Sequence, residues 1–94
     1  MGLLKMGSYD CGGVAKSIFT RKHDYFRALM LDARKKAKLT QRQLADKLGR
    51  PQSWVSKYES GERRLDVLEF HEVALVLRID LRRFFRELKK RSDA

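Results

Sequence analysis

The chain has 94 residues, 43% of them hydrophobic with a single proline, and this composition favours one compact helical domain over a disordered chain. Its 22 Lys and Arg against 12 Asp and Glu give a formal net charge of +10 at pH 7. Such an excess indicates a polyanionic partner, most simply nucleic acid, with an anionic membrane surface as the competitor. No apolar run approaches the roughly 20 residues of a membrane-spanning helix. The single cysteine, Cys11, excludes an intrachain disulfide and a cysteine-based zinc site, and fits a reducing cytoplasm.

Residues 1–19 differ from the rest of the sequence. They hold four of the six glycines and contribute only +1 to the net charge, from two lysines and one aspartate. They are too polar and too often interrupted by glycine to form the apolar core of a signal peptide. We therefore expect a flexible N-terminal arm at 1–19, with a short extended piece at 14–19, and a folded domain at 20–91.

Within the domain, apolar residues recur at helical spacing and capping residues separate the repeats. Thr20 and Thr40 are placed as N-caps of the first two helices, and Gln43 completes a capping box with Thr40. Asp66 with Glu69 forms a second such pattern. No stretch alternates convincingly as a strand, so the sequence predicts an all-α fold. The five predicted helices cover 20–37, 41–48, 52–59, 67–77 and 81–90.

The segment 41–60 reads as two short helices joined by a tight turn. Gly49 can take the left-handed conformation that ends a helix, and Pro51 suits the first turn of the next one. Small or branched residues at Ala45, Gly49 and Val55 allow the two helices to cross closely. This pattern predicts a helix-turn-helix, whose second helix enters the DNA major groove. The alternative is an αα-hairpin in an ordinary small helical domain.

Residues 25–88 carry a set of recognisable short motifs: Leu39-Thr40-Gln41, Leu44-Ala45, Leu48-Gly49, Gln52-Ser53, Val55-Ser56, Tyr58-Glu59, Gly61, Val73-Ala74 and Leu77. In these motifs the sequence resembles the lambda-repressor-like (Xre/Cro) helix-turn-helix family. Family members are five-helix DNA-binding domains, mostly bacterial and phage transcription regulators that act as dimers on palindromic operators. The sequence departs from the family pattern at Pro51, where Ser or Thr is preferred, and at Arg78, where a small residue is usual.

The helix 52–59 is the predicted reading helix, and residues near its N-terminus should face the bases. Gln52 has the geometry to pair with adenine, and Lys57 can reach a guanine or a phosphate. The resemblance also places base reading at Gln52, Ser53 and Lys57. Trp54 either points at the DNA or simply covers the core. The predicted base contacts are Gln52, Ser53, Trp54, Ser56 and Lys57.

Phosphate contacts should come from free backbone N–H groups at helix N-termini and from nearby polar and cationic side chains. The predicted set is Gln41, Arg42, Arg50, Ser60, Arg63 and Arg64. The resemblance implies a different role for Arg34 and Glu59, namely an inward salt bridge that joins the first helix to the third.

The helix 67–77 has more apolar residues than one core-facing stripe needs. Leu68 and Leu75 remain, with His71 between them, and Phe84 or Leu88 of the last helix would extend them into an exposed apolar patch. We expect this patch to form a twofold dimer that places two reading helices about 34 Å apart. The alternative is that Leu68 and Leu75 pack under the N-terminal arm.

Enzymatic and metal-binding functions find little support. His23 and His71 lie far apart in sequence without Cys or His neighbours at ligand spacing, and Cys11 has no positioned base. We therefore expect no catalytic activity, cofactor or metal.

The sequence predicts a dimeric, sequence-specific DNA-binding protein of the bacterial nucleoid, most simply a repressor. The alternatives are an antitoxin-like module whose main partner is another protein, and a non-specific chromosome-coating protein.

Overall fold

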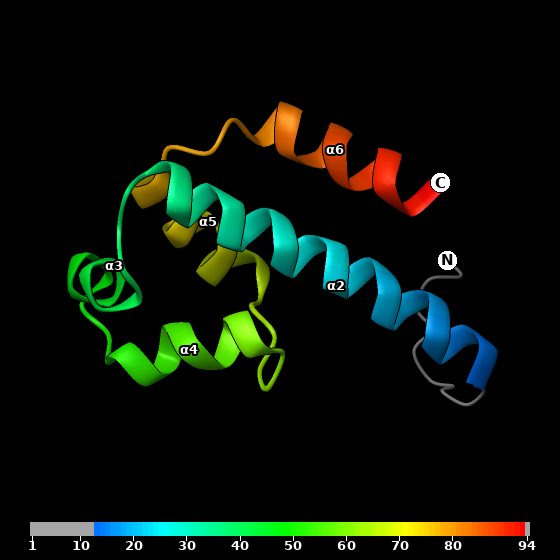
Figure 1. Ribbon diagram of the computed structural model, residues 1–94, viewed down its shortest axis with the longest axis horizontal. Helices are drawn as coiled ribbons and strands as arrows, with labels where there is room; N and C mark the ends of the chain where they lie inside the picture. Colours follow the sequence, from blue (N-terminus) through cyan, green and yellow to red (C-terminus); the bar gives the residue numbers. More distant parts are fainter. Residues whose placement is uncertain (1–12, 94) are drawn as a thin grey trace.

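The computed structural model describes the backbone of residues 13–93 and the side chains of residues 21–92. Over that range the chain forms α-helices and no strands, so the predicted all-α class is confirmed. The long helix α2 lies across the molecule, with α6 packed along one side of it and α4 along the other (Figure 1). The short helix α3 contacts both α4 and α5. The helices are α2 (Gly13–Lys36), α3 (Gln41–Leu48), α4 (Gln52–Ser60), α5 (Val67–Leu77) and α6 (Leu81–Asp93).

The first helix begins seven residues earlier than predicted. Residues 14–19 belong to α2, so the expected extended piece is wrong, and Thr20 lies inside the helix instead of capping it. No glycine or proline occurs from Val14 to Lys36, so no residue of that type interrupts the helical hydrogen bonding of α2. Residues 1–12 of the predicted arm lie outside the described part of the chain.

Two capping boxes fix the starts of α3 and α5. The backbone N–H of Gln43 donates to Oγ1 of Thr40 at 3.0 Å, and the Thr40 N–H donates to Oε1 of Gln43 at 2.9 Å. At α5, the N–H of Glu69 donates to Oδ1 of Asp66 at 2.8 Å, and the reciprocal bond is 3.0 Å long. Each box satisfies two of the backbone donors that a helix start leaves without partners. Both boxes match the prediction.

The helix ends show how the two departures from the family pattern are accommodated. Pro51 is the N-cap of α4 in an extended conformation, and its side chain makes no capping hydrogen bond. Arg78 ends α5 with φ 57° and ψ 44°, the left-handed conformation that a glycine adopts at lower cost. The turn before α4 uses Gly49 at φ 69°, as expected for a glycine that ends a helix.

The core gathers where α2, α4 and α5 meet, around Met30, Val55 and Val73, none of which is exposed to solvent. Phe84 and Leu88 of α6 join this core and are only 6% and 9% exposed. Their predicted place in an exposed patch is therefore wrong. Because α6 packs along α2, its inward face is covered, and the residue left half-exposed is the neighbouring Phe85, at 50%.

Aromatic rings hold α6 against the rest of the core. The Phe84 ring lies 5.7 Å from that of Phe26 on α2 and 5.3 Å from that of Phe70 on α5, measured between ring centroids. Edge-to-face and tilted ring pairs of this kind add stability beyond the area that they bury. This three-ring contact is the physical reason that Phe84 faces inward.

Candidate nucleic-acid interface

The helix α4 presents a polar outer face and an apolar inner face. Val55 and Tyr58 are buried on the inner face, one helical turn apart. On the outer face Gln52, Ser53 and Lys57 are exposed. Ser56, also predicted to touch bases, is partly buried. The structure therefore brings four of the five predicted base-contacting residues together on the side of α4 that no other helix of the described residues covers.

A chain of side-chain hydrogen bonds supports the first of these residues. Nε2 of Gln52 donates to Oε1 of Gln41 at 3.3 Å, across the turn between α3 and α4. Nε2 of Gln41 donates in turn to Oε1 of Glu59 at 2.9 Å. Gln52 is thus positioned at the start of α4 by a residue of α3 that is itself held by the end of α4.

The predicted salt bridge between Arg34 and Glu59 is present. Nε of Arg34 donates to Oε2 of Glu59 at 2.8 Å, and Nη2 donates to Oε1 at 3.1 Å. Nη1 donates to the backbone oxygen of Leu39 at 2.9 Å. The two charged side chains are only 12% and 8% exposed, so the pair is largely screened from water. This salt bridge joins α2 to the C-terminal end of α4.

Trp54 lies apart from the other predicted base contacts. Its indole is partly buried against the core and meets the Tyr58 ring edge-on, with centroids 5.4 Å apart. The guanidinium carbons of Arg50 and Arg63 lie 4.4 Å and 5.3 Å from the indole centroid. Cations at these distances over an indole ring are attracted to its π face. The structure therefore shows the second of the two alternatives for Trp54, in which it covers the core.

The same two arginines, which the sequence assigned to phosphates, form internal ion pairs. Arg50 pairs with Glu72 of α5 at 3.2 Å, and Arg63 makes two bonds to Glu69, at 3.2 and 3.1 Å. The Arg63 bond and the capping bond from Asp66 hold the pKa of Glu69 below its ordinary value. We call this group the Trp54 clamp: Arg50, Trp54, Arg63, Glu69 and Glu72.

The other predicted phosphate-contacting residues differ in whether their side chains form hydrogen bonds within the domain. Arg42 and Arg64 are exposed, and their side chains form no hydrogen bond or ion pair with the rest of the described chain. The hydroxyl of Ser60 donates to the backbone oxygen of Lys57 at 3.2 Å and accepts from the Glu62 N–H at 3.4 Å. Gln41, as described above, bonds both Gln52 and Glu59.

Arg27 is a site residue that the sequence analysis missed. Its Nη1 donates to the backbone oxygen of Glu59 at 3.0 Å, near the end of α4. Its guanidinium also packs on Gly61, where an added Cβ would come within 3.2 Å of Cζ. In the sequence Arg27 is one of many cations around an amphipathic helix, and no local pattern distinguishes it from the others.

The predicted dimer residues on α5 are exposed. Leu68 and Leu75 are 72% and 65% exposed, and His71 between them is also exposed. The inward face of the same helix carries Phe70 and Val73.

Among the described residues, every helix is too short or too polar to span a membrane.

Comparison with known proteins agrees with this geometry. A family model described as helix-turn-helix matches residues 30–84. The chain is also similar to the solved structure of an XRE-family like protein from Pseudomonas syringae pv. tomato str. DC3000, with 39% sequence identity and a TM-score of 0.78. That match covers 84% of this chain and 96% of the other. No curated protein matches the sequence.

The chain belongs to the XRE-like helix-turn-helix family. This XRE-family domain is a DNA-binding regulator of the helix-turn-helix type. In the helix-turn-helix arrangement the second helix lies in the major groove, and in this domain that helix is α4.

Proposed function

We propose that this XRE-family protein is a sequence-specific transcriptional repressor that binds a palindromic operator as a dimer in the bacterial cytoplasm. The observation that carries the proposal is the uncovered polar face of α4, with Gln52, Ser53 and Lys57 exposed above a fully buried Val55. The net charge of +10 supports binding to DNA at this face. Occupying an operator would exclude the transcription machinery from the same duplex.

Base reading is assigned to the outer face of α4. Gln52 can bond the N6 and N7 edge of adenine, and its contact with Gln41 limits the orientations that its amide adopts. Ser53 and Ser56 can donate to or accept from either base type, and Lys57 can donate to guanine. We assign Trp54 to the clamp and give it no base contact, because its ring is already occupied by Arg50 and Arg63.

Phosphate binding is assigned first to Arg42 and Arg64, which form no hydrogen bond or ion pair within the described residues, and to the N-terminus of α3 beside Gln41. Ser60 adds a hydroxyl near the end of α4. Arg50 and Arg63 would contact phosphate only by giving up bonds to Glu72 and Glu69. We therefore expect them to contribute less per charge than Arg42.

The dimer is assigned to the outer face of α5. Leu68 and Leu75 are seven residues apart, about 10 Å along the helix, and would form a twofold seam with His71 between them. Two copies joined there would present their α4 helices to successive major grooves, about 34 Å apart. The burial of Phe84 and Leu88 restricts the proposed seam to α5.

Selecting bound duplexes from a random pool tests the base-reading assignment. Gln52→Ala should relax the preference at one base position, with a loss of about 1–3 kcal/mol in discrimination, because a bidentate contact is removed. The matched control is Lys47→Gln, an exposed lysine of α3 outside the assigned contacts. If the Gln52→Ala and Lys57→Ala variants both select the wild-type sequence with undiminished discrimination, the proposal is wrong.

Sedimentation at micromolar concentration tests the dimer. Leu68→Glu with Leu75→Glu should convert the wild-type dimer to a monomer, because like charges would face each other across the twofold axis. Leu81→Glu, at a partly exposed position on α6, should leave the dimer intact. A wild-type protein that sediments only as a monomer contradicts the assignment.

A second candidate is an antitoxin-like role, in which the main partner is another protein. The observation in its favour is a groove of about 440 Å³ beside Leu75. Leu48 of α3, Arg50 of the following turn, and Glu72 and Val76 of α5 line it. Purification of the protein from its host with a stoichiometric partner, together with weak selection of any duplex, would favour this candidate over the repressor.

A further inference from the structure

The helix α6 carries a row of cations on the face turned away from the core. Phe84 and Leu88 mark its inward face. With about 100° between successive residues, the opposite face is occupied by positively charged side chains along its described length. All of them are exposed, and Glu87, at the edge of this face, pairs with Lys90 at 3.7 Å. We call this face the α6 stripe: Arg82, Arg86, Lys89 and Lys90.

The α6 stripe and the reading face of α4 point in different directions. α6 packs along one side of α2, whereas α4 packs along the other (Figure 1). The molecule measures 38 × 26 × 21 Å along its principal axes. A duplex seated on α4 is therefore separated from the α6 stripe by the body of the domain, and the two faces can be occupied at the same time.

Two cations of the stripe, Arg82 and Arg86, differ from the arginines near α4 in that no carboxylate balances them. Near α4, Arg50 and Arg63 are neutralised by Glu72 and Glu69. In contrast, the exposed side chains of Arg82 and Arg86 form no hydrogen bond or ion pair within the described residues.

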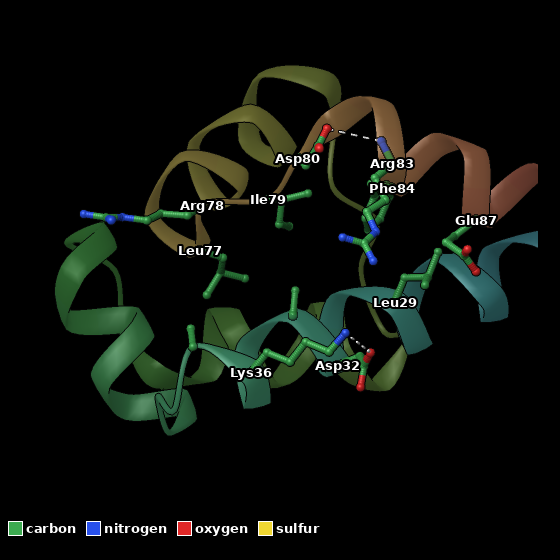
Figure 2. A pocket seen from close by; sticks show the side chains of 12 residues that line it. Leu29, Asp32, Lys36, Leu77, Arg78, Ile79, Asp80, Arg83, Phe84 and Glu87 are labelled. Carbon is green, nitrogen blue, oxygen red and sulfur yellow. Dashed lines mark hydrogen bonds and ion pairs between the residues drawn. The ribbon is translucent and has the colours of Figure 1, made fainter.

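The groove between α2 and α6 is likewise balanced (Figure 2). Its charged lining consists of three cations and three carboxylates, and Lys36 pairs with Asp32 at 3.6 Å. Arg83 lines this groove and is directed toward it in Figure 2. The excess positive charge of α6 is therefore concentrated on its outer face.

We propose that the α6 stripe binds the phosphate backbone of a second DNA duplex, so that one molecule bridges two duplexes. A row of cations without nearby hydrogen-bonding amides suits phosphate contacts, which carry no sequence information. A membrane surface fits less well. The exposed apolar residues of α6 are Leu81 and Phe85, and the Phe85 ring leans on Phe70 with centroids 5.8 Å apart. That leaves too little free apolar surface for insertion among lipids.

A bridging assay tests this proposal directly. One duplex is attached to beads, the protein is added, and capture of a second, fluorescent duplex of unrelated mixed sequence is measured in low salt. Arg82→Gln with Arg86→Gln should reduce capture about tenfold and lower the salt slope of bridging by about 2, because each phosphate contact contributes about 0.9. Binding of the selected operator to α4, measured separately, should change by less than about twofold.

Matched variants separate this result from a simple loss of charge. Lys35→Gln with Lys47→Gln removes the same two charges from exposed positions on α2 and α3 and should bridge like the wild type. Gln52→Ala with Lys57→Ala should lose sequence preference but keep the binding of mixed-sequence duplex at the α6 stripe. Failure of the repressor assignment and failure of the bridging assignment are thus distinguishable.

Three outcomes would overturn the bridging proposal. The first is wild-type bridging by the Arg82→Gln, Arg86→Gln variant with its helical circular dichroism intact. The second is an equal loss of operator binding and bridging in that variant. The third is tighter binding of the wild-type stripe to polyglutamate or to vesicles containing phosphatidylserine than to mixed-sequence duplex, with dependence on Arg82 and Arg86.

Discussion

The guanidinium group of Arg34 donates one hydrogen bond to each carboxylate oxygen of Glu59. The bonds to Arg34 and Gln41 leave Glu59 tied to both α2 and α3. The backbone oxygen of the same residue accepts from Arg27. A single acidic residue near the end of α4 therefore fixes the reading helix relative to its two neighbours. This arrangement lets a nine-residue helix keep one orientation although its outer face is free.

We expect the Arg34–Glu59 pair to be strongly coupled. Glu59→Ala should lower the free energy of unfolding by about 3 kcal/mol, because it leaves the largely buried charge of Arg34 without its carboxylate counter-ion. Arg34→Ala should cost at least as much, since it also removes the bond to the Leu39 oxygen. The double variant should lose less than the sum of the two, by about 1–3 kcal/mol. Urea denaturation of all four proteins measures the coupling, and additive losses would contradict a direct interaction.

The two glycines that flank α4 should respond differently to alanine. Gly49→Ala should cost about 1 kcal/mol, because only the left-handed backbone conformation is strained and no atom lies within 4 Å of the added Cβ. Gly61→Ala should cost about 2 kcal/mol, because its φ of 92° is less favourable and Arg27 must also move. Thermal unfolding compares the two variants. Equal losses would show that the Arg27 contact contributes nothing.

Adjacent phenylalanines of α6 provide a test of which face is buried. Phe84→Ala should destabilise the protein by about 3–5 kcal/mol, because it opens a cavity between Phe26 and Phe70. Phe85→Ala should cost about 1 kcal/mol, since half of that side chain is already in water. Urea denaturation curves of the two single variants give the loss of unfolding free energy for each substitution. The reverse order would place Phe85 in the core.

Stability should fall as the solution is acidified through the titration range of His23. Partial burial, then the charges of Arg64 and Arg27, lower the pKa of His23 below 6.5, while Asp24 acts in the opposite direction. The unfolded chain therefore takes up the proton first, so this stability is present above about pH 6.5 and is lost as the pH falls through the lower folded-state pKa. Urea midpoints at about pH 7.5 and 5.5 should differ less for His23→Gln than for the wild type. An unchanged difference would exclude His23 as the source.

Local features of the fold were predictable from the sequence because their partners lie close along the chain. The capping boxes at Thr40 and Asp66 span only three residues, so the residue types alone identify them. The left-handed end at Gly49 follows in the same way. The outer face of α4 could be predicted from the two inward residues, Val55 and Tyr58, since helical spacing then fixes which positions point outward.

The contacts that the sequence did not reveal are long-range or involve a choice between neighbours. Arg50 and Glu72 are 22 residues apart, and nothing local indicates that the cation turns toward α5 and away from DNA. Phe84 and Phe85 both fit an apolar stripe by spacing, and only the packing of α6 against α2 decides between them. The start of α2 was missed because Thr20 is a good capping residue that here lies within a continuous helix.

The ion pair between Arg50 and Glu72 links the proposed dimer helix, α5, to the turn that leads into the reading helix, α4. Glu72 borders the same groove as Leu75, while Arg50 lies over the indole of Trp54 on the reading helix. Association through α5 would remove water from this pair and strengthen it, and would thereby hold α4 more firmly. By thermodynamic reciprocity, operator DNA would then tighten subunit association by the same factor. Occupancy of the operator would rise cooperatively with protein concentration.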